Sequence, residues 1–317
     1  MGARWWIILG ALAVLAPTGS LAASAGDPIA VLTEIRTGQG EVRVKLANEA
    51  DWRAPLPLLS LRPGDQVQAT RNAAAVLMFT GGQGTLTVSA TNSPYTVQAP
   101  AGAPAGGKAS SLVASLSQFL MGKKKELNYV PLTTRSVKQP PLLLSPRVGK
   151  LLGPPILEWG GSDRLRYTVR VLSPQALVWE QANLPRTPLP YPTSAPSLSP
   201  GVPYRWELEA KDFPIQQGQF TILPPVESAS IRESLAALEP AALPGYPKNT
   251  VSLMRAGFLF EQGLYVEARK ELLGAIAADP DEPSLHLLLG HVYERTGLRE
   301  LAAEEFDEAE FLSTRSP

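Results

Sequence analysis

The end of the chain contains one unit written twice, and this repeat constrains the fold more than any other feature. The run Gly263-Leu264-Tyr265 returns 34 residues later as Gly297-Leu298-Arg299. Further pairs at the same offset are Leu259 with Tyr293, Ala268 with Ala302, Leu272 with Phe306, and Ala275 with Ala309. A fixed period of this length, with small and large residues in fixed places, predicts pairs of antiparallel helices stacked side by side.

Each unit is expected to hold two helices. The predicted first helices are 251–262 and 284–296, and the predicted second helices are 265–278 and 299–312. Gly263 and Gly297 fall in the turns, where a helix end often takes the left-handed conformation that glycine adopts at little cost. Asp279-Pro280 is expected to stop the second helix, because proline lacks an N–H and restricts the residue before it. Ser284 is the expected N-cap of the next helix.

This pattern resembles the tetratricopeptide repeat (TPR) family. The match is good in the second helix of each unit and weaker in the first helix of the first unit, where Arg255 replaces a large apolar residue. The resemblance implies a surface that binds proteins. Two units are fewer than the roughly three that a free-standing solenoid needs. We therefore expect either a packed extra helix at 230–238 or repeats that lean on the preceding domain.

By register with the TPR family, eight residues of the first helices would face a concave groove that binds a protein partner. They are Leu253, Gly257, Phe260, Glu261, Leu287, His291, Glu294 and Arg295. Phe260 would anchor a partner side chain, and the charged residues would select the partner by charge. The open alternative is that these residues form an ordinary solvated or packing face.

The first residues are typical of a signal peptide. Arg4 precedes an apolar run at 5–16, and small residues follow at 20–25. The run is too short for an ordinary membrane-spanning helix. We expect cleavage after Ala22 or Ala25, no stable membrane span afterwards, and a location in the periplasm or cell envelope. An uncleaved anchor is the alternative.

Composition and proline clusters divide the chain into parts. Lys plus Arg and Asp plus Glu both number 29, so no nucleic-acid partner is expected, and the lack of cysteine excludes disulfides. Clusters among the 31 prolines mark the boundaries of a multidomain β + α protein. The expected parts are a signal peptide at 1–25, a β domain at 27–100, a linker with an amphipathic helix at 101–145, a β-sandwich at 146–225, and helical repeats at 228–317 in units of about 249–282 and 283–316.

The first β domain has a characteristic order of features. Residues 40–45 and 85–88 alternate apolar and polar side chains, as strands with one buried face do, and 73–79 is a continuous apolar strand. Trp52 and the L-x-x-G-D run at 61–65 lie between them. This order resembles the FecR-type domain of bacterial envelopes. The resemblance implies a role in iron-transport signalling or in an envelope scaffold.

Two features of this region have competing interpretations. Asp65 invites a catalytic role, but we expect its side chain to cap the Pro63-Gly64-Asp65 turn. Residues 109–121 have apolar side chains at helical spacing and precede the basic run Lys123-Lys124-Lys125. That helix either contacts anionic lipid or cell-wall polymer, or packs on a neighbouring β domain.

The second β domain is expected to be a two-sheet sandwich, because short alternating strands are separated by turns rich in proline and glycine. Tyr167 and Val169 share one face of a strand at 166–172. The run at 198–210 and an early tryptophan resemble fibronectin type III (Fn3) and immunoglobulin-like (Ig-like) sandwiches. Trp159 and Trp206 are then core residues. The alternative, stacking on a sugar ring, requires them to be exposed.

No pattern in the chain indicates an enzyme. The two histidines, His286 and His291, are five residues apart on one helix and so do not share a metal as an i, i+4 pair would. No catalytic, cofactor or metal residues are expected. The sequence predicts an exported scaffold or adaptor that binds envelope proteins through its repeats. The alternatives are a binder of peptidoglycan or another surface polymer through the FecR-like domain, and a FecR-type envelope signalling component.

Overall fold

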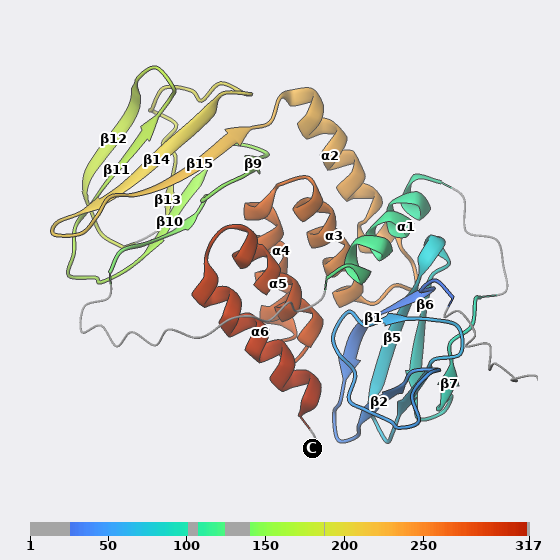
Figure 1. Cartoon of the computed structure of the whole chain (residues 1–317). Helices are drawn as coiled ribbons and strands as arrows, with labels where there is room; N and C mark the ends of the chain where they lie inside the picture. The colour runs from blue at the N-terminus through green and yellow to red at the C-terminus, as the bar shows by residue number, and fades with distance from the viewer. Residues whose placement is uncertain (1–25, 101–106, 124–139, 187, 316–317) are drawn as a thin grey trace, which may run out of the picture.

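The computed structural model describes residues 26–100, 107–123, 140–186 and 188–315. The predicted signal peptide and two of the three consecutive lysines, Lys124 and Lys125, lie outside the described residues. Two β parts stand at opposite ends of the molecule with the helices between them (Figure 1). The protein is therefore a mixed β and α protein, as predicted at this coarse level.

The N-terminal β part contains two small antiparallel sheets. One has the order β3-β1-β5-β6, from Ser60–Leu61, Ala30–Arg36, Ala74–Phe79 and Thr85–Ser89, and the 3-10 turn η1 (Thr80–Gly82) follows β5. The other has the order β2-β4-β7, from Val42–Lys45, Gln66–Ala69 and Tyr95–Thr96. Strand β1 is buried on both faces, because Leu32 points into the β core and its neighbour Val31 points toward the helices.

The second β part, at residues 142–222, is a sandwich of two sheets. The sheets have the orders β13-β10-β8 and β12-β11-β14-β15-β9. The strands are β8 (Leu142–Ser145), β9 (Lys150–Leu151), β10 (Ile156–Gly160), β11 (Tyr167–Leu172), β12 (Leu177–Leu184), β13 (Leu189–Pro190), β14 (Pro203–Ala210) and β15 (Gln216–Ile222). Trp159 and Trp206 are buried in its core, and the Trp206 indole donates to the Pro146 carbonyl at 2.6 Å. Neither ring is open to a sugar.

The helices follow the predicted pattern closely. They are α1 (Lys108–Met121), α2 (Pro225–Ala237), α3 (Lys248–Glu261), α4 (Tyr265–Ala278), α5 (Pro283–Arg295) and α6 (Arg299–Thr314), with a short 3-10 turn η2 (Pro240–Ala242) before α3. The turn inside each helix pair contains a glycine, Gly263 between α3 and α4 and Gly297 between α5 and α6, with φ of 75° and 77° in the left-handed region. Ala268 and Ala302 are buried where the helices approach, as the repeat predicts.

The predicted N-cap of α5 is wrong by two residues. Pro283 is the first helical residue, because its fixed φ suits that position and its missing N–H would have no partner there. Glu282 is therefore the N-cap, and its carboxylate accepts from the Ser284 N–H at 3.1 Å.

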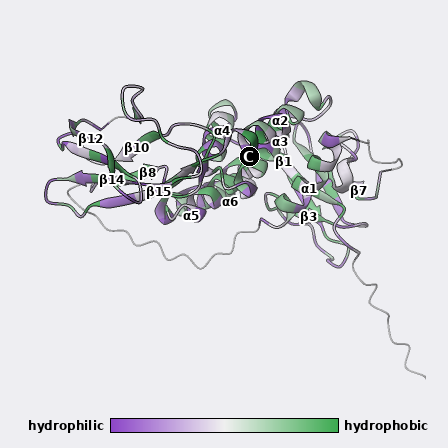
Figure 2. Cartoon of the chain, turned by 90° about the horizontal axis from the view of Figure 1, so that it is seen from above, coloured by the Kyte–Doolittle hydropathy of each residue, from purple (hydrophilic) through white to green (hydrophobic). Residues whose placement is uncertain are grey.

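One apolar core joins the N-terminal β part to the helices. It contains Val31 and Met78 from the sheet, Leu116 and Leu120 from α1, and Leu253 from α3. Figure 2 shows hydrophobic segments where α2, α3 and β1 meet. The two helical units thus rest on the N-terminal β part and on α1, neither of which the sequence indicated as their support. The extra helix expected at 230–238 lies largely within α2, whose Ile231 belongs to the same core.

Candidate functional site

The eight predicted groove residues lie on α3 and α5, and most of that surface is covered by the chain itself. Leu253, Gly257, Leu287 and His291 are buried, Phe260 is half-buried, and Glu261, Glu294 and Arg295 are exposed. Leu253 and Leu287 belong to the core shared with β1 and α1. The groove is therefore divided into a covered part and an open end.

Helix α1 covers the middle of the groove. A Cβ atom at Gly257 would lie 3.1 Å from Cδ1 of Phe119, which is tighter than an ordinary contact. The rings of Phe119 and Phe260 have centroids 5.5 Å apart. Only the absence of a side chain at Gly257 lets the aromatic ring of α1 approach the backbone of α3 this closely.

The apolar face of α1 is buried against both the sheet and the helices. Val113, Leu116 and Leu120 are almost fully buried, and α1 contacts η1, β1, α2 and α3. At its C-terminal end, the hydroxyl of Ser60 donates to the Met121 carbonyl at 3.2 Å. The packing interpretation of this helix is confirmed, and its partners include α3 as well as the expected β domain.

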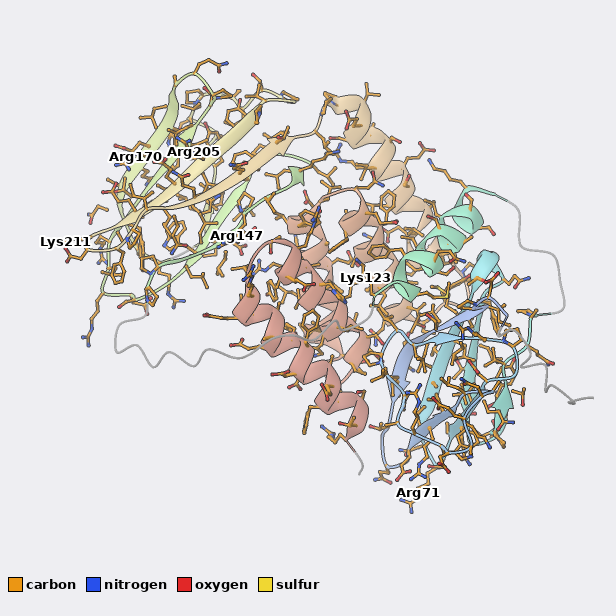
Figure 3. All side chains as sticks on the ribbon, viewed as in Figure 1. Arg71, Lys123, Arg147, Arg170, Arg205 and Lys211 are labelled. Carbon is orange, nitrogen blue, oxygen red and sulfur yellow. The ribbon has the colours of Figure 1, made fainter. Side chains whose placement is uncertain are left out.

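The open end of the groove carries five side chains that we call the rim cluster: Lys123, Phe260, Glu261, Glu294 and Arg295. The ammonium of Lys123 lies 4.5 Å from the Phe119 ring centroid and 4.3 Å from that of Phe260, which are cation–π distances. Burial lowers the pKa of Lys123, and the carboxylates of Glu261 and Glu294 raise it in part. Figure 3 places Lys123 just past α1, beside the other helices.

Arg295 of the rim cluster also contacts an aromatic side chain, and Glu261 is close to Lys123. Arg295 donates through Nε to the Tyr265 hydroxyl at 3.0 Å, and the Tyr265 ring packs edge-on against Phe260. Burial raises the pKa of the Glu261 carboxyl, while Lys123 lowers it. The rim cluster is thus an aromatic floor with one lysine, one arginine and two glutamates around it.

His291 lies beneath the rim cluster. Its Nδ1 is 3.3 Å from the Glu294 carboxylate, and its ring packs on Phe306 with centroids 5.0 Å apart. Its Nε2 is buried, and no residue that the structure describes hydrogen-bonds to it. Burial lowers the pKa of His291, and the positive charge of Lys123 lowers it further, so the neutral imidazole is favoured at neutral pH.

His286 faces a different environment, as the spacing of five residues predicts. Its Nδ1 lies 2.7 Å from the Glu305 carboxylate and its Nε2 lies 3.0 Å from the Pro280 carbonyl. Burial alone would lower the pKa of His286, but the two acceptors raise it above its ordinary value. An imidazole with an acceptor at each nitrogen is best satisfied when both nitrogens carry protons.

The N-terminal ends of α3 and α5 are held by two buried glutamates. Glu34 of β1 accepts from the N–H and the hydroxyl of Thr250 at 3.0 and 2.8 Å. Glu282 accepts from the N–H of Ile35 on β1 at 3.0 Å as well as capping its own helix. Burial, together with the nearby charge of Glu34, raises the pKa of Glu282 to about 8.

The C-terminal ends of the same two helices are held by the sandwich. The N–H of Lys150 donates to the Gly263 carbonyl at 2.9 Å, just past α3. Arg147 donates through Nε to the Thr296 carbonyl at 2.8 Å, just past α5. Figure 3 shows Arg147 between the sandwich and the helices. The N-terminal ends of α3 and α5 thus meet Glu34 of β1 and the N-cap Glu282, and the C-terminal carbonyls meet donors from the sandwich.

A hollow of about 950 Å³ lies beside α3, apart from the rim cluster. It is lined by parts of α2, α3 and α4, including Leu235, Leu259 and Gly274. Its Arg255 side chain pairs with Glu239 at 2.7 Å and with Glu271 at 3.1 Å. These ion pairs explain why an arginine stands where the TPR pattern has a large apolar residue.

Asp65 is a structural residue. Its two carboxylate oxygens accept from the N–H groups of Arg62 and Ala47 at 2.7 and 2.8 Å, and its side chain is buried. The expectation that Asp65 caps its turn is confirmed.

Among the described residues, no three acidic or histidine side chains come together as metal ligands. No described helix has the length and apolar character needed to cross a membrane. The chain matches no protein-family model, and its sequence matches no curated protein. The function must therefore be argued from the groove and its surroundings.

Proposed function

We propose that this chain is an exported, non-enzymatic scaffold of the bacterial cell envelope that holds a protein partner at the groove of its helical repeats. The rim cluster is the observation that carries this proposal. It combines exposed charges of both signs with a half-buried aromatic floor, which is the chemistry that protein interfaces use for anchoring and selection. Glu261, Glu294 and Arg295 stand exposed around Phe260 on two adjacent helices.

The finer fold assignment is part of the same proposal. The N-terminal β part is FecR-like, the sandwich is Fn3-like or Ig-like, and the two helix pairs are TPR-like. The order of strands around Asp65, the buried Trp159 and Trp206, and the helix pairs repeated at Gly263 and Gly297 support these assignments. Envelope proteins are the expected partners, and a signal peptide at 1–25 would export the chain.

Site-specific photo-crosslinking in cells tests the proposal. A photoreactive amino acid replaces Glu294 in the rim cluster, and a matched control replaces Lys211, an exposed residue at the far tip of the sandwich (Figure 3). We expect the probe at 294 to capture a discrete protein adduct that the probe at 211 does not capture. The adduct should disappear when Glu261 and Arg295 are reversed in charge.

Two outcomes would overturn the proposal. One is a probe at 294 that captures no protein under conditions in which the chain is exported and folded. The other is a set of adducts that is identical for positions 294 and 211. Either result would move the binding role away from the repeats and toward the β parts.

A further inference from the structure

The C-terminal half of α1, together with Lys123 just past its end, carries four side chains at the spacing of a helix that binds in a groove. Leu116, Phe119, Leu120 and Lys123 stand at positions i, i+3, i+4 and i+7, which is the pattern by which an amphipathic helix is recognised. Leu116 and Leu120 are fully buried. Phe119, Leu120 and Lys123 lie against the predicted groove residues Gly257 or Phe260.

Three of these side chains meet a specific feature of the groove. The Phe119 ring lies over Gly257, and the Leu120 side chain would be 3.7 Å from a Cβ atom at that glycine. Lys123 lies over Phe119 and Phe260 and is attracted to Glu261 and Glu294. The groove therefore recognises an aromatic side chain, because its ring can approach the backbone at Gly257 closely. It recognises a lysine one turn later through cation–π and charge contacts.

The two halves of α1 are held by different surfaces. The first turn is seated on η1, where Ser110 approaches so closely that a Cβ atom at Gly82 would be 2.4 Å from its hydroxyl oxygen. The last turns pack on the groove and on the sheet, where Leu116 and Leu120 share a core with Val31 and Met78, and the Ser60 hydroxyl donates to the Met121 carbonyl.

We propose that the groove formed by α3 and α5 is a receptor for an amphipathic helix that carries a leucine, an aromatic residue followed by leucine, and a lysine at the spacing found in α1. In this chain α1 occupies the receptor, and a partner helix with the same anchors competes with it. This inference rests on the proposed function, and it names the partner's chemistry. It also gives α1 the role of an internal competitor at the site.

A peptide-binding measurement tests this inference with the full chain. The probe is a fluorescent synthetic peptide with the sequence of residues 107–123, and its binding is followed by anisotropy. The test protein carries Phe119→Ala and Lys123→Glu, which weaken the internal helix and leave the groove intact. The control protein carries Ser115→Ala and Gln118→Ala, two exposed positions on the same helix. Circular dichroism and a thermal melt establish that each protein is folded.

We expect the peptide to bind the test protein at least about tenfold more tightly than the wild type or the control, because a site occupied by its own helix binds an added ligand in proportion to the fraction that is open. A peptide with the same two substitutions should bind none of the proteins. If the double variant fails to fold, Lys123→Glu alone should raise the affinity by a smaller factor in the same direction.

Equal binding to all proteins, or binding to none, would overturn the inference. Crosslinking from position 294 would then decide the fate of the proposed function separately. A surviving adduct at 294 with no peptide binding means that the groove holds a partner of other chemistry and that α1 is only a strut. If the peptide does not bind and position 294 captures no adduct, the repeats are not the binding site.

Discussion

Single side chains determine how the groove is closed. Gly257 admits the Phe119 ring, Glu282 ties α5 to β1, and Glu34 ties α3 to β1. The repeat register predicts that Gly257 and Phe260 share a face, and both lie against Phe119 of α1. It could not predict what covers that face, because a repeat pattern describes only the helix that carries it.

Substitution of Gly257 tests the close approach of α1. Gly257→Leu should destabilise the protein by about 1–3 kcal/mol, because the new side chain collides with Phe119 in a packed site. Gly274→Ala is the matched control, since it also lies in a helix but has open space around it. Denaturant unfolding measures both. A Gly257→Leu protein as stable as Gly274→Ala would show that α1 does not sit on α3.

The pH dependence of stability should include a contribution from Glu282. Its pKa is raised from 4.5 to about 8, so the folded state holds a proton that the unfolded state has lost between these values. The contribution to the free energy of unfolding is largest below about pH 4.5 and falls by about 1.4 kcal/mol per pH unit as pH rises toward 8. The nearby charged groups on β1, Glu34 and Arg36, stay unchanged in the test.

Glu282→Gln mimics the protonated carboxyl and should remove this slope. We expect the variant and the wild type to have similar stability at pH 5 and the variant to be more stable at pH 8. Unfolding by urea at four pH values between 5 and 8 gives both curves. Parallel curves across that range would mean that Glu282 is ionised in the folded protein.

At the scale of elements, the helix bounds were the most predictable part of the structure. Helix α4 begins and ends at the predicted residues, because Gly263 and Asp279-Pro280 mark its two ends in the sequence. The cap of α5 was missed, since Glu282 acts through a tertiary contact with Ile35 as well as through its own helix. The amphipathic pattern of α1 indicated a buried face, but the partner surface lies more than a hundred residues away in the sequence.

The contact between Arg147 and α5 gives a prediction at this scale. Arg147→Ala should destabilise the protein by about 1–3 kcal/mol, because it removes hydrogen bonds from a charged group to the carbonyls of Thr296 and Leu143. Arg164→Ala, at an exposed position of the sandwich, is the control. Hydrogen exchange at the C-terminal end of α5 should accelerate only in the Arg147 variant. Unchanged exchange there would show that the Arg147 contact does not stabilise the C-terminal end of α5.

The whole molecule is a set of helices clamped at both ends of α3 and α5 by two β parts. Hydrogen bonds from β1 reach the N-terminal ends, and hydrogen bonds from the sandwich loop reach the C-terminal ends. The proline-rich boundaries suggested separate domains joined by linkers, because composition shows where the chain turns and not which surfaces meet. The shared core shows that the N-terminal β part and the helices are packed as one body.

This packing predicts that the N-terminal β part and the helices lose stability together. Thr250→Val removes one of the two hydrogen bonds that Thr250 donates to the buried Glu34 carboxylate, at a cost of about 1–3 kcal/mol. Hydrogen exchange measured by mass spectrometry should then accelerate in β1, α3 and α5 together. Acceleration confined to α3 would show that the two regions unfold separately.

Hydrogen exchange of the α1 amides shows directly whether this helix occupies the groove. We predict that the amides of 112–121 in the wild type are protected to the same degree as those of α3, because both belong to one core. In Gly257→Leu the protection of 112–121 should fall while that of α4 is retained. Rapid exchange of 112–121 in the wild type, beside a fully protected α3, would show that α1 does not occupy the groove.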